Sequence, residues 1–188
     1  MKKNGSSSKI TGFVVIFALL VLFPFLLPFF NRLQNSYGLQ VNIPLPQSRI
    51  KEILTRPPAA YIFVFFGYTT CSKACPVMTA GTLAKLPAEH RKYFISIDNN
   101  KDKLDNLERH YSGKVMFISG SDGEIRNFMK PFNGFFYKKE EEIIHTTNLY
   151  LLDKSGNVRY IYTTLNPDIA EIQKDIIKLE KENASYGN

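Results

Sequence analysis

The chain has 188 residues, of which 44% are hydrophobic and 22% charged, enough for one globular domain with its own core and a short appendage. Two cysteines in the whole chain exclude a scaffold built on several disulfide bonds. The formal net charge is +7, but Lys2, Lys3 and Lys9 precede an apolar run, and the remaining +4 is spread thinly. Since no basic stripe alternates with aromatic residues, we expect no nucleic-acid partner.

Residues 10–30 form a run of 21 uncharged, mostly apolar residues, ITGFVVIFALLVLFPFLLPFF. A helix of this length covers the roughly 30 Å of a bilayer's hydrocarbon core. Because three lysines precede the run, we expect one transmembrane helix in the inner (plasma) membrane, with residues 1–9 as a cytoplasmic tail and the domain facing the periplasm or cell exterior. A cleaved signal peptide is the alternative, but bulky residues stand at 28–32, where cleavage needs small ones.

Residues 31–56 are interpreted as a linker leading into the domain, because prolines interrupt the segment and its end. A short strand is expected inside it, near 39–43. The domain itself is assigned to 57–188. It opens with 60–66, a continuous run of apolar, β-branched and aromatic residues, which predicts a strand buried on both faces.

The next elements alternate between helix and strand. Pro76 suits the first position of a helix, and Pro87 ends that helix. Further along, strands are predicted at 93–98 and 115–119, and helices at 101–111 and 124–130.

The last elements are a hairpin and a helix. Residues 154–157, KSGN, form a turn sequence, so the strands on either side, 147–153 and 158–163, pair in antiparallel fashion. Asn166-Pro167 then opens a helix with an apolar face. Parallel strand–helix–strand units followed by a hairpin and a helix predict a mixed α/β sheet flanked by helices.

Both cysteines lie in the loop GYTTCSKACP, between the buried strand and the helix opened by Pro76. Ligands of open α/β sheets collect at the carboxyl ends of strands, where this loop lies. Cys75 stands at the helix start and Cys71 just before it, so the two sulfurs can converge there. The positive end of the helix dipole, with Lys73, favours the thiolate, which binds soft metals or attacks disulfides.

The sequence FVFFGYTTCSKACP resembles the signature of the Sco/SenC family of membrane-anchored copper proteins, and the resemblance extends over residues 40–182. It implies a thioredoxin-like fold behind one transmembrane helix. It also implies copper delivery to the copper-bearing subunit of cytochrome c oxidase or to another copper protein. The family's third copper ligand is a histidine just before the penultimate hairpin, and His145 in IIHTT occupies that place. The resemblance therefore implies copper held by Cys71, Cys75 and His145.

The chemistry of this residue set agrees with copper. Two thiolates and one imidazole suit Cu(I) in trigonal geometry, and with an added oxygen or water they also suit Cu(II). Zinc accepts the same ligands, although a closed structural zinc site normally has four. The chain departs from the family pattern at Ser72, often proline, and at Ile144, commonly acidic. Asp98 matches an aspartate that follows the second core strand.

Two functions are consistent with the cysteine pair. One is a copper metallochaperone without turnover of its own. The other is a thiol–disulfide oxidoreductase, or a redox or copper sensor, using Cys71 and Cys75. Redox thioredoxin-like proteins use Cys-x-x-Cys and a cis-proline ahead of the hairpin, whereas here three residues separate the cysteines and Thr146-Thr147 stands at that place. This favours metal binding, with a thiol reductant needed to keep the pair reduced.

Structural or solvent-exposed positions, without a part in metal binding, are expected for the other candidate residues. A purely structural Cys71–Cys75 disulfide would close so short a loop that it constrains the unfolded chain only modestly. His90 and His110 stand among charged residues and are predicted to be solvated. Met78 and Met129 are candidate soft ligands for a metal. Met78 lies in the helix after the cysteines and fits core packing better. The charge run at 138–142 is predicted to be an exposed loop.

Overall fold

The computed structural model describes residues 21–22, 36–56, 59–70, 75–98, 100–140, 142–164 and 166–185. The chain divides into two compact units, Met1–Ser36 and Tyr37–Asn188. The predicted anchor at 10–30 lies outside the described residues, except for Val21 and Leu22, which are helical. Within the described part of the chain, no helix has the length and apolar character needed to cross a bilayer.

The second unit contains the elements that the sequence predicts, with four additions. In chain order the elements are β1 (Leu39–Pro44), α2 (Arg49–Thr55), β2 (Tyr61–Gly67), α3 (Cys75–Lys85), β3 (Arg91–Ser96), α4 (Lys101–Tyr111), β4 (Met116–Ser119), α5 (Asp122–Met129), the 3₁₀ turn η1 (Lys130–Phe132), β5 (Phe136–Lys139), β6 (Glu142–His145), β7 (Leu149–Asp153), β8 (Asn157–Tyr162) and α6 (Ile169–Ser185). The additions are α2, the turn η1 and the pair β5 and β6.

Helix α2 lies within the segment interpreted as a linker. Ser48 caps it by accepting a hydrogen bond from the backbone N–H of Lys51. Ile50 and Leu54 are four residues apart, so they share a helix face, and both are fully buried. The segment before β2 is therefore part of the domain's packing.

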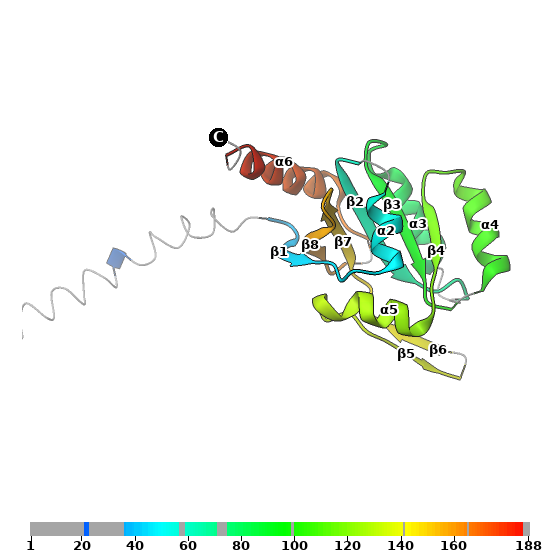
Figure 1. The fold of residues 1–188 in the computed structure, drawn as a ribbon. Coiled ribbons are helices and arrows are strands. Elements are labelled where there is room, and N and C mark those ends of the chain that lie inside the picture. The colour runs from blue at the N-terminus through cyan, green and yellow to red at the C-terminus, as the bar shows by residue number, and fades with distance from the viewer. Residues whose placement is uncertain are drawn as a thin grey trace, which may run out of the picture. The chain divides into compact units, whose positions relative to one another are not determined.

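Six strands form one sheet in the order β1-β8-β7-β2-β3-β4 (Figure 1). Strands β2, β3 and β4 are parallel, whereas β7, β8 and β1 pair in antiparallel fashion. The prediction of a mixed α/β sheet is confirmed. The predicted hairpin around residues 154–157 is present as β7 and β8.

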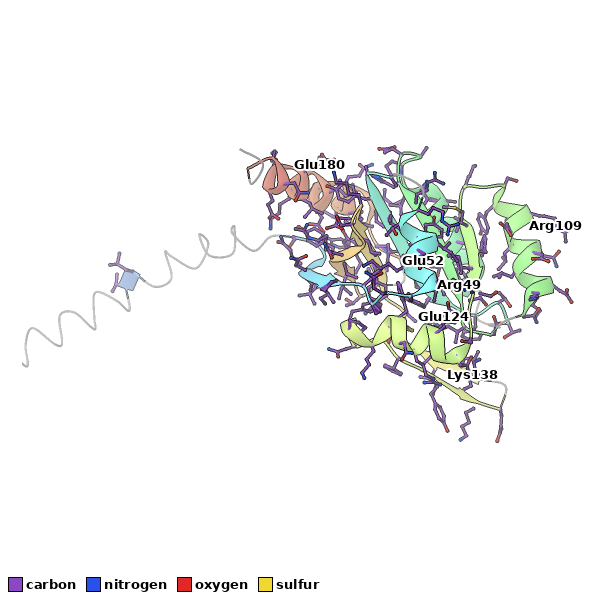
Figure 2. All side chains as sticks on the ribbon, viewed as in Figure 1. Arg49, Glu52, Arg109, Glu124, Lys138 and Glu180 are labelled. Carbon is purple, nitrogen blue, oxygen red and sulfur yellow. The ribbon has the colours of Figure 1, made fainter. Side chains whose placement is uncertain are left out.

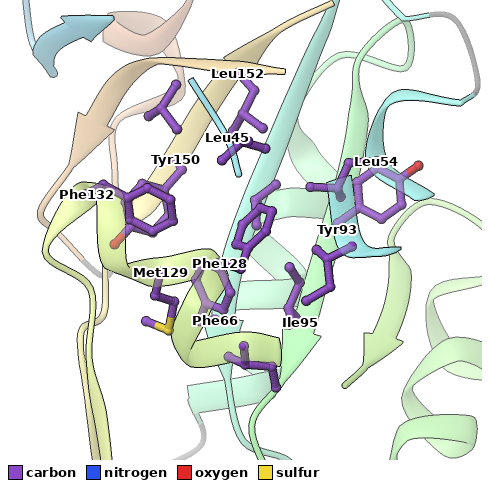
Figure 3. Close-up of a cluster of buried hydrophobic side chains, with 14 of the residues drawn as sticks. Leu45, Leu54, Phe66, Tyr93, Ile95, Phe128, Met129, Phe132, Tyr150 and Leu152 are labelled. Atoms are coloured by element: carbon purple, nitrogen blue, oxygen red, sulfur yellow. The ribbon is translucent and has the colours of Figure 1, made fainter. Parts of the chain in front are cut away.

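Strand β2 is buried on both faces, as its continuous apolar run predicts. Ile62, Val64 and Phe66 belong to one core, shown in Figure 3, together with residues of α2 and α5. The alternate side chains of β2 belong to a second core, together with residues of α3, α4 and α6. These side chains are Tyr61, Phe63 and Phe65. The sheet therefore carries a helical layer on each face.

On the first face, α2 and α5 are joined by an ion pair. The Nε atom of Arg49 lies 3.1 Å from Oε1 of Glu124, and both residues are labelled in Figure 2. Met129, at the end of α5, is completely buried in the first core, which is a packing role. The side chain of Met78 lies outside the described residues.

The segment predicted as an exposed loop at 138–142 is exposed over residues 138–140, as predicted, but it is not a loop throughout. Residues 138–139 belong to β5 and residue 142 to β6, and these strands form a separate two-stranded sheet. Phe136 pairs with His145 in this hairpin, and Tyr137 pairs with Ile144. Because side chains alternate along a strand, Tyr137 and Ile144 share one face of the hairpin, and Phe136 and His145 share the other.

Replacing Phe66 tests the importance of the first core. Phe66→Ala in a fragment of residues 37–188 should lower the free energy of unfolding by about 3–5 kcal/mol, because it leaves a cavity among packed aromatic rings. Urea denaturation followed by circular dichroism measures this change. Tyr137→Ala is the control, since Tyr137 is 58% exposed and its loss should cost below about 1 kcal/mol. Equal losses in the two variants would contradict the packing described here.

Candidate metal centre

The cysteine loop leaves β2 at a point of close packing. Gly67 ends the strand beside the ring of Phe94, and a Cβ atom there would lie 2.6 Å from the nearest ring carbon. Only glycine fits that gap. The backbone N–H of Ile97 donates a 2.8 Å hydrogen bond to the Gly67 carbonyl, which fixes the loop's first residue against the end of β3.

Asp98 holds the next residues of the loop. Its Oδ2 atom accepts hydrogen bonds from the backbone N–H and the hydroxyl of Thr69, both at 2.8 Å. The same oxygen accepts from the N–H of Thr70 at 3.0 Å and from its hydroxyl at 3.1 Å. The other oxygen accepts from the hydroxyl of Ser96 at 2.5 Å. One carboxylate thus ties the end of β3 to the residue directly before Cys71.

The charge state of Asp98 follows from these bonds. Partial burial raises the pKa of the carboxyl, but the hydrogen bonds from Ser96, Thr69 and Thr70 together outweigh it and lower the pKa below its ordinary value. Asp98 is therefore ionised at neutral pH and accepts every one of these bonds as a carboxylate.

Of the predicted metal ligands, the structure describes the two cysteines only in part. Cys71 lies outside the described residues. Cys75 is the first residue of α3, with Pro76 in the first turn, as the sequence predicts. The side chain of Cys75 lies outside the described part of the structure.

His145 ends β6, and the hairpin carries its ring to the cysteine loop. The ring meets Tyr68 edge-on with centroids 5.5 Å apart. It also meets Phe65 edge-on at 6.4 Å. Since Tyr68 is three residues before Cys71, the structure brings His145 beside the loop that bears the cysteines. Residues more than 70 positions apart in the sequence are thus neighbours.

The two ring nitrogens of His145 have different surroundings. Nδ1 lies 2.9 Å from the carbonyl oxygen of Thr146, an acceptor, so Nδ1 carries the proton and donates it to this bond. Burial lowers the pKa of His145, although the bond to Thr146 partly opposes the shift. The ring is therefore neutral at neutral pH, and the lone pair of Nε2 is available to bind a metal.

Helix α5 holds the hairpin in place. Arg126 donates a 2.7 Å hydrogen bond to the backbone carbonyl of Phe136, and its guanidinium lies 4.0 Å above the Phe136 ring. Phe136 is the residue that pairs with His145. Lys138 also forms a 2.5 Å ion pair with Asp122 of α5. The position of His145 thus depends on contacts that no local sequence pattern indicates.

The other two histidines are not part of this site. His110 is exposed on α4, as predicted. His90 is predicted to be solvated, and this prediction is wrong. Its ring is buried between the rings of Tyr61 and Phe63, with centroids 5.7 Å from each. It stands before β3, at the opposite end of the sheet from the cysteine loop, and burial lowers its pKa.

The fold is a thioredoxin-like mixed α/β fold, with the cysteine loop at the carboxyl end of a central parallel strand. The family model described as SCO1/SenC matches residues 55–181. The chain therefore belongs to the SCO1/SenC family, as the resemblance of its cysteine loop implies.

Individual relatives are distant in sequence. The chain is 23% identical over 133 residues to Protein SCO1 homolog 1, mitochondrial, of Arabidopsis thaliana, and this match covers 63% of the chain but only 40% of that protein. A SCO1/SenC family lipoprotein from Bacillus anthracis superposes with a TM-score of 0.58 at 23% identity, covering 78% of this chain and 96% of the other. Arabidopsis thaliana ScoI with copper bound gives 0.57 at 19% identity, covering 78% and 99%.

Removing the charge of Asp98 tests its role in the loop. Asp98→Asn should lower the free energy of unfolding at neutral pH by about 1–3 kcal/mol, because charged acceptors form stronger hydrogen bonds. The folded-state pKa of Asp98 is lowered, so its stabilisation is present above the unfolded pKa and is lost as pH falls through the folded pKa. Urea denaturation at neutral and acid pH should therefore show a difference that shrinks in acid.

Asp105→Asn is the matched control, because Asp105 is exposed on α4. It should change stability by less than about 0.5 kcal/mol at either pH. A loss for Asp98→Asn that stays constant down to the most acid pH would exclude the carboxylate's charge as the cause.

Proposed function

We propose that this chain is a membrane-anchored copper metallochaperone in which Cys71, Cys75 and His145 hold the copper cargo. Membership of the SCO1/SenC family supports the class of function, and the similar ScoI structure from Arabidopsis thaliana has copper bound. The observation that carries the proposal is the placement of His145 beside Tyr68 of the cysteine loop. A neutral imidazole is thereby presented to the segment that bears both thiols.

The residues present fit copper as a ligand set. The Nδ1 of His145 is bonded to the Thr146 carbonyl, so Nε2 is the nitrogen that would bind the metal. Cys75 begins α3, and the positive end of that helix favours the thiolate. Two thiolates and one imidazole are the soft donors that hold Cu(I), and an added oxygen ligand would complete a Cu(II) site.

The proposed cellular setting comes from the sequence and the family. Residues 10–30 would hold the chain in the inner (plasma) membrane, with residues 1–9 in the cytoplasm and the domain in the periplasm or at the cell exterior. The proposed recipient is the copper-bearing subunit of cytochrome c oxidase or another copper protein. A thiol reductant would keep the cysteine pair able to bind copper.

Copper titration of the reduced protein tests the ligand set. We expect one copper per chain, with Cu(I) binding lost in Cys71→Ser and in Cys75→Ser because each removes a charged soft donor. His145→Ala should spare Cu(I), which two thiolates can hold linearly. It should weaken Cu(II) binding at least about tenfold. Mutating a residue that only hydrogen-bonds to a metal ligand already lowers metal affinity by about that factor. Competition with a chelator and the visible spectrum report both affinities.

The control is His110→Ala, which removes an exposed imidazole from α4. This variant should bind Cu(I) and Cu(II) with the affinities of the unmodified chain. If His145→Ala also binds Cu(II) with unchanged affinity, His145 is not a ligand. In that case the proposed site would lose its nitrogen donor.

The oxidation state of the cysteine pair should control copper binding. An added disulfide such as oxidised glutathione accepts two electrons and the thiol protons from the pair and leaves as two thiols, while a Cys71–Cys75 disulfide forms. His145 is then the remaining proposed donor. Affinity for copper should therefore fall at least about a hundredfold in the oxidised protein. Binding measured before and after reduction by a phosphine, which is itself removed before the titration, gives this ratio.

The same samples distinguish copper binding from thiol–disulfide exchange. Weak copper binding in both states, together with rapid reduction of insulin disulfides, would support the oxidoreductase alternative. Equal copper binding in both states would instead exclude the cysteines as ligands.

A further inference from the structure

Helix α6 presents a lysine-rich face on the side away from the core. Its inward residues Ile172, Ile176 and Leu179 are buried in the second core. On the exposed side, one shallow depression is lined by Lys174, Ile177, Lys178, Lys181 and Glu182. Ile177 is 50% exposed at its centre. Glu182 also lines this depression, and Lys174 forms an ion pair with Glu171, so the three lysines leave only a small excess of positive charge on this face. An exposed aliphatic side chain beside lysines is typical of helices that lie on anionic membranes.

The start of the domain is fixed to this helix. The backbone N–H groups of Tyr37 and Gly38 donate hydrogen bonds of 3.0 and 2.8 Å to the carboxylate of Asp175, which is 2% exposed. The hydroxyl of Tyr37 accepts a 3.0 Å hydrogen bond from the N–H of Asp168. The chain therefore enters the domain at a definite place along α6.

Further contacts extend this junction along β1. The side-chain amide of Gln40 donates to Glu182 at 2.9 Å, and Lys178 donates to the amide oxygen of Gln40 at 3.3 Å. Leu39, between these tethered residues, is 62% exposed. Tyr37 is also exposed. Exposed apolar side chains of the second unit thus occur at the β1–α6 junction and at the β5–β6 hairpin.

The length of chain between the apolar run and the domain limits how far the domain can move from a bilayer. The run ends at Phe30, and six residues separate it from Tyr37. Fully extended, the seven steps from Phe30 to Tyr37 span at most about 25 Å. A weak surface contact is sufficient under such a tether, because the effective concentration reaches the millimolar range.

We infer that the lysine face of α6 binds the anionic headgroups of the membrane that holds residues 10–30; this inference rests on the anchor in the proposed function. Lys174, Lys178 and Lys181 supply positive charge where phosphate groups supply negative charge. Their alkyl chains and Ile177 reach the apolar boundary of the headgroup layer. The bilayer is the only occupant proposed for this face.

This orientation leaves the hairpin in water. Helix α6 packs on the second core, whereas α5, which holds β5 and β6, packs on the first core at the other face of the sheet. Figure 2 shows Glu180 on α6 and Lys138 on the hairpin well apart. The exposed side chains of Phe135, Tyr137 and Ile144 therefore face the aqueous side, where a protein partner can meet them.

Single tryptophans provide the test, because the chain contains none. The full chain carrying Ile177→Trp is reconstituted into vesicles of brominated phosphatidylcholine with about one third phosphatidylglycerol, and into vesicles without phosphatidylglycerol. We expect about half of the emission to be quenched in the anionic vesicles and little in the neutral ones. Tyr137→Trp on the hairpin should remain unquenched in both. Salt near 0.5 M should abolish the quenching at position 177, because the Debye length falls to about 4 Å.

Two variants with the same change in total charge distinguish an effect of the α6 lysines from an effect of overall charge. The first variant combines Ile177→Trp with replacement of the three α6 lysines: Lys174→Gln, Lys178→Gln and Lys181→Gln. The other removes three lysines exposed on the α4 side instead, Lys101→Gln, Lys103→Gln and Lys114→Gln. The first should lose the quenching and the second should keep it. Circular dichroism melting confirms that both remain folded.

Flotation of the same vesicles distinguishes this inference from the proposed anchor. Protein that floats with both lipid compositions but shows no quenching at position 177 overturns the α6 contact and leaves the anchor in place. Quenching of Tyr137→Trp in place of Ile177→Trp overturns it as well, since the hairpin would then face the bilayer. Protein that does not float with either composition overturns both the anchor and the contact.

Discussion

Every side chain of β2 is buried, so this strand can lie only at the centre of the sheet with a packed layer on each face. Alternate side chains belong to the two cores, and each core supplies its own helices. The end of β2 is therefore one of the most rigid points of the domain. The cysteine loop begins there, at Gly67, where close packing against Phe94 admits no side chain.

The site is assembled on that end by two connections to other parts of the chain. Asp98 binds four donors of Thr69 and Thr70 and so joins the loop to β3. The β5–β6 hairpin carries His145 to Tyr68, and α5 holds the hairpin through Arg126. A metal carrier needs ligands that are positioned in advance yet able to exchange their cargo. The hairpin lies outside the main sheet and is held by the buried ring of Phe136 and by contacts of α5, an attachment that suits the second requirement.

The domain also has two distinct outer surfaces with different physical character. The α6 face exposes three lysines beside Ile177 and adjoins the place where the chain enters the domain. The outward face of the hairpin is apolar and adjoins His145. If the first lies against the membrane, the second is turned toward soluble domains. The separation would let a carrier stay on the bilayer while its metal centre meets a partner.

The sequence by itself determined the central strand, the cysteine loop at its end, the helix begun by Cys75 and Pro76, and the family, because these are continuous patterns of a few residues each. It also located His145 through the position that its family relatives use. Tertiary structure alone decided that residues 138–139 and 142 belong to two paired strands, that His90 is buried, and that Asp98 binds the loop. It also placed Thr146 as the partner of His145. These features depend on long-range contacts, such as the guanidinium of Arg126 above Phe136 and the rings that enclose His90. A charged stretch such as KKEEE forms either paired strands or an unpaired loop, depending on which elements pack beside it. Local composition does not indicate which of the two forms.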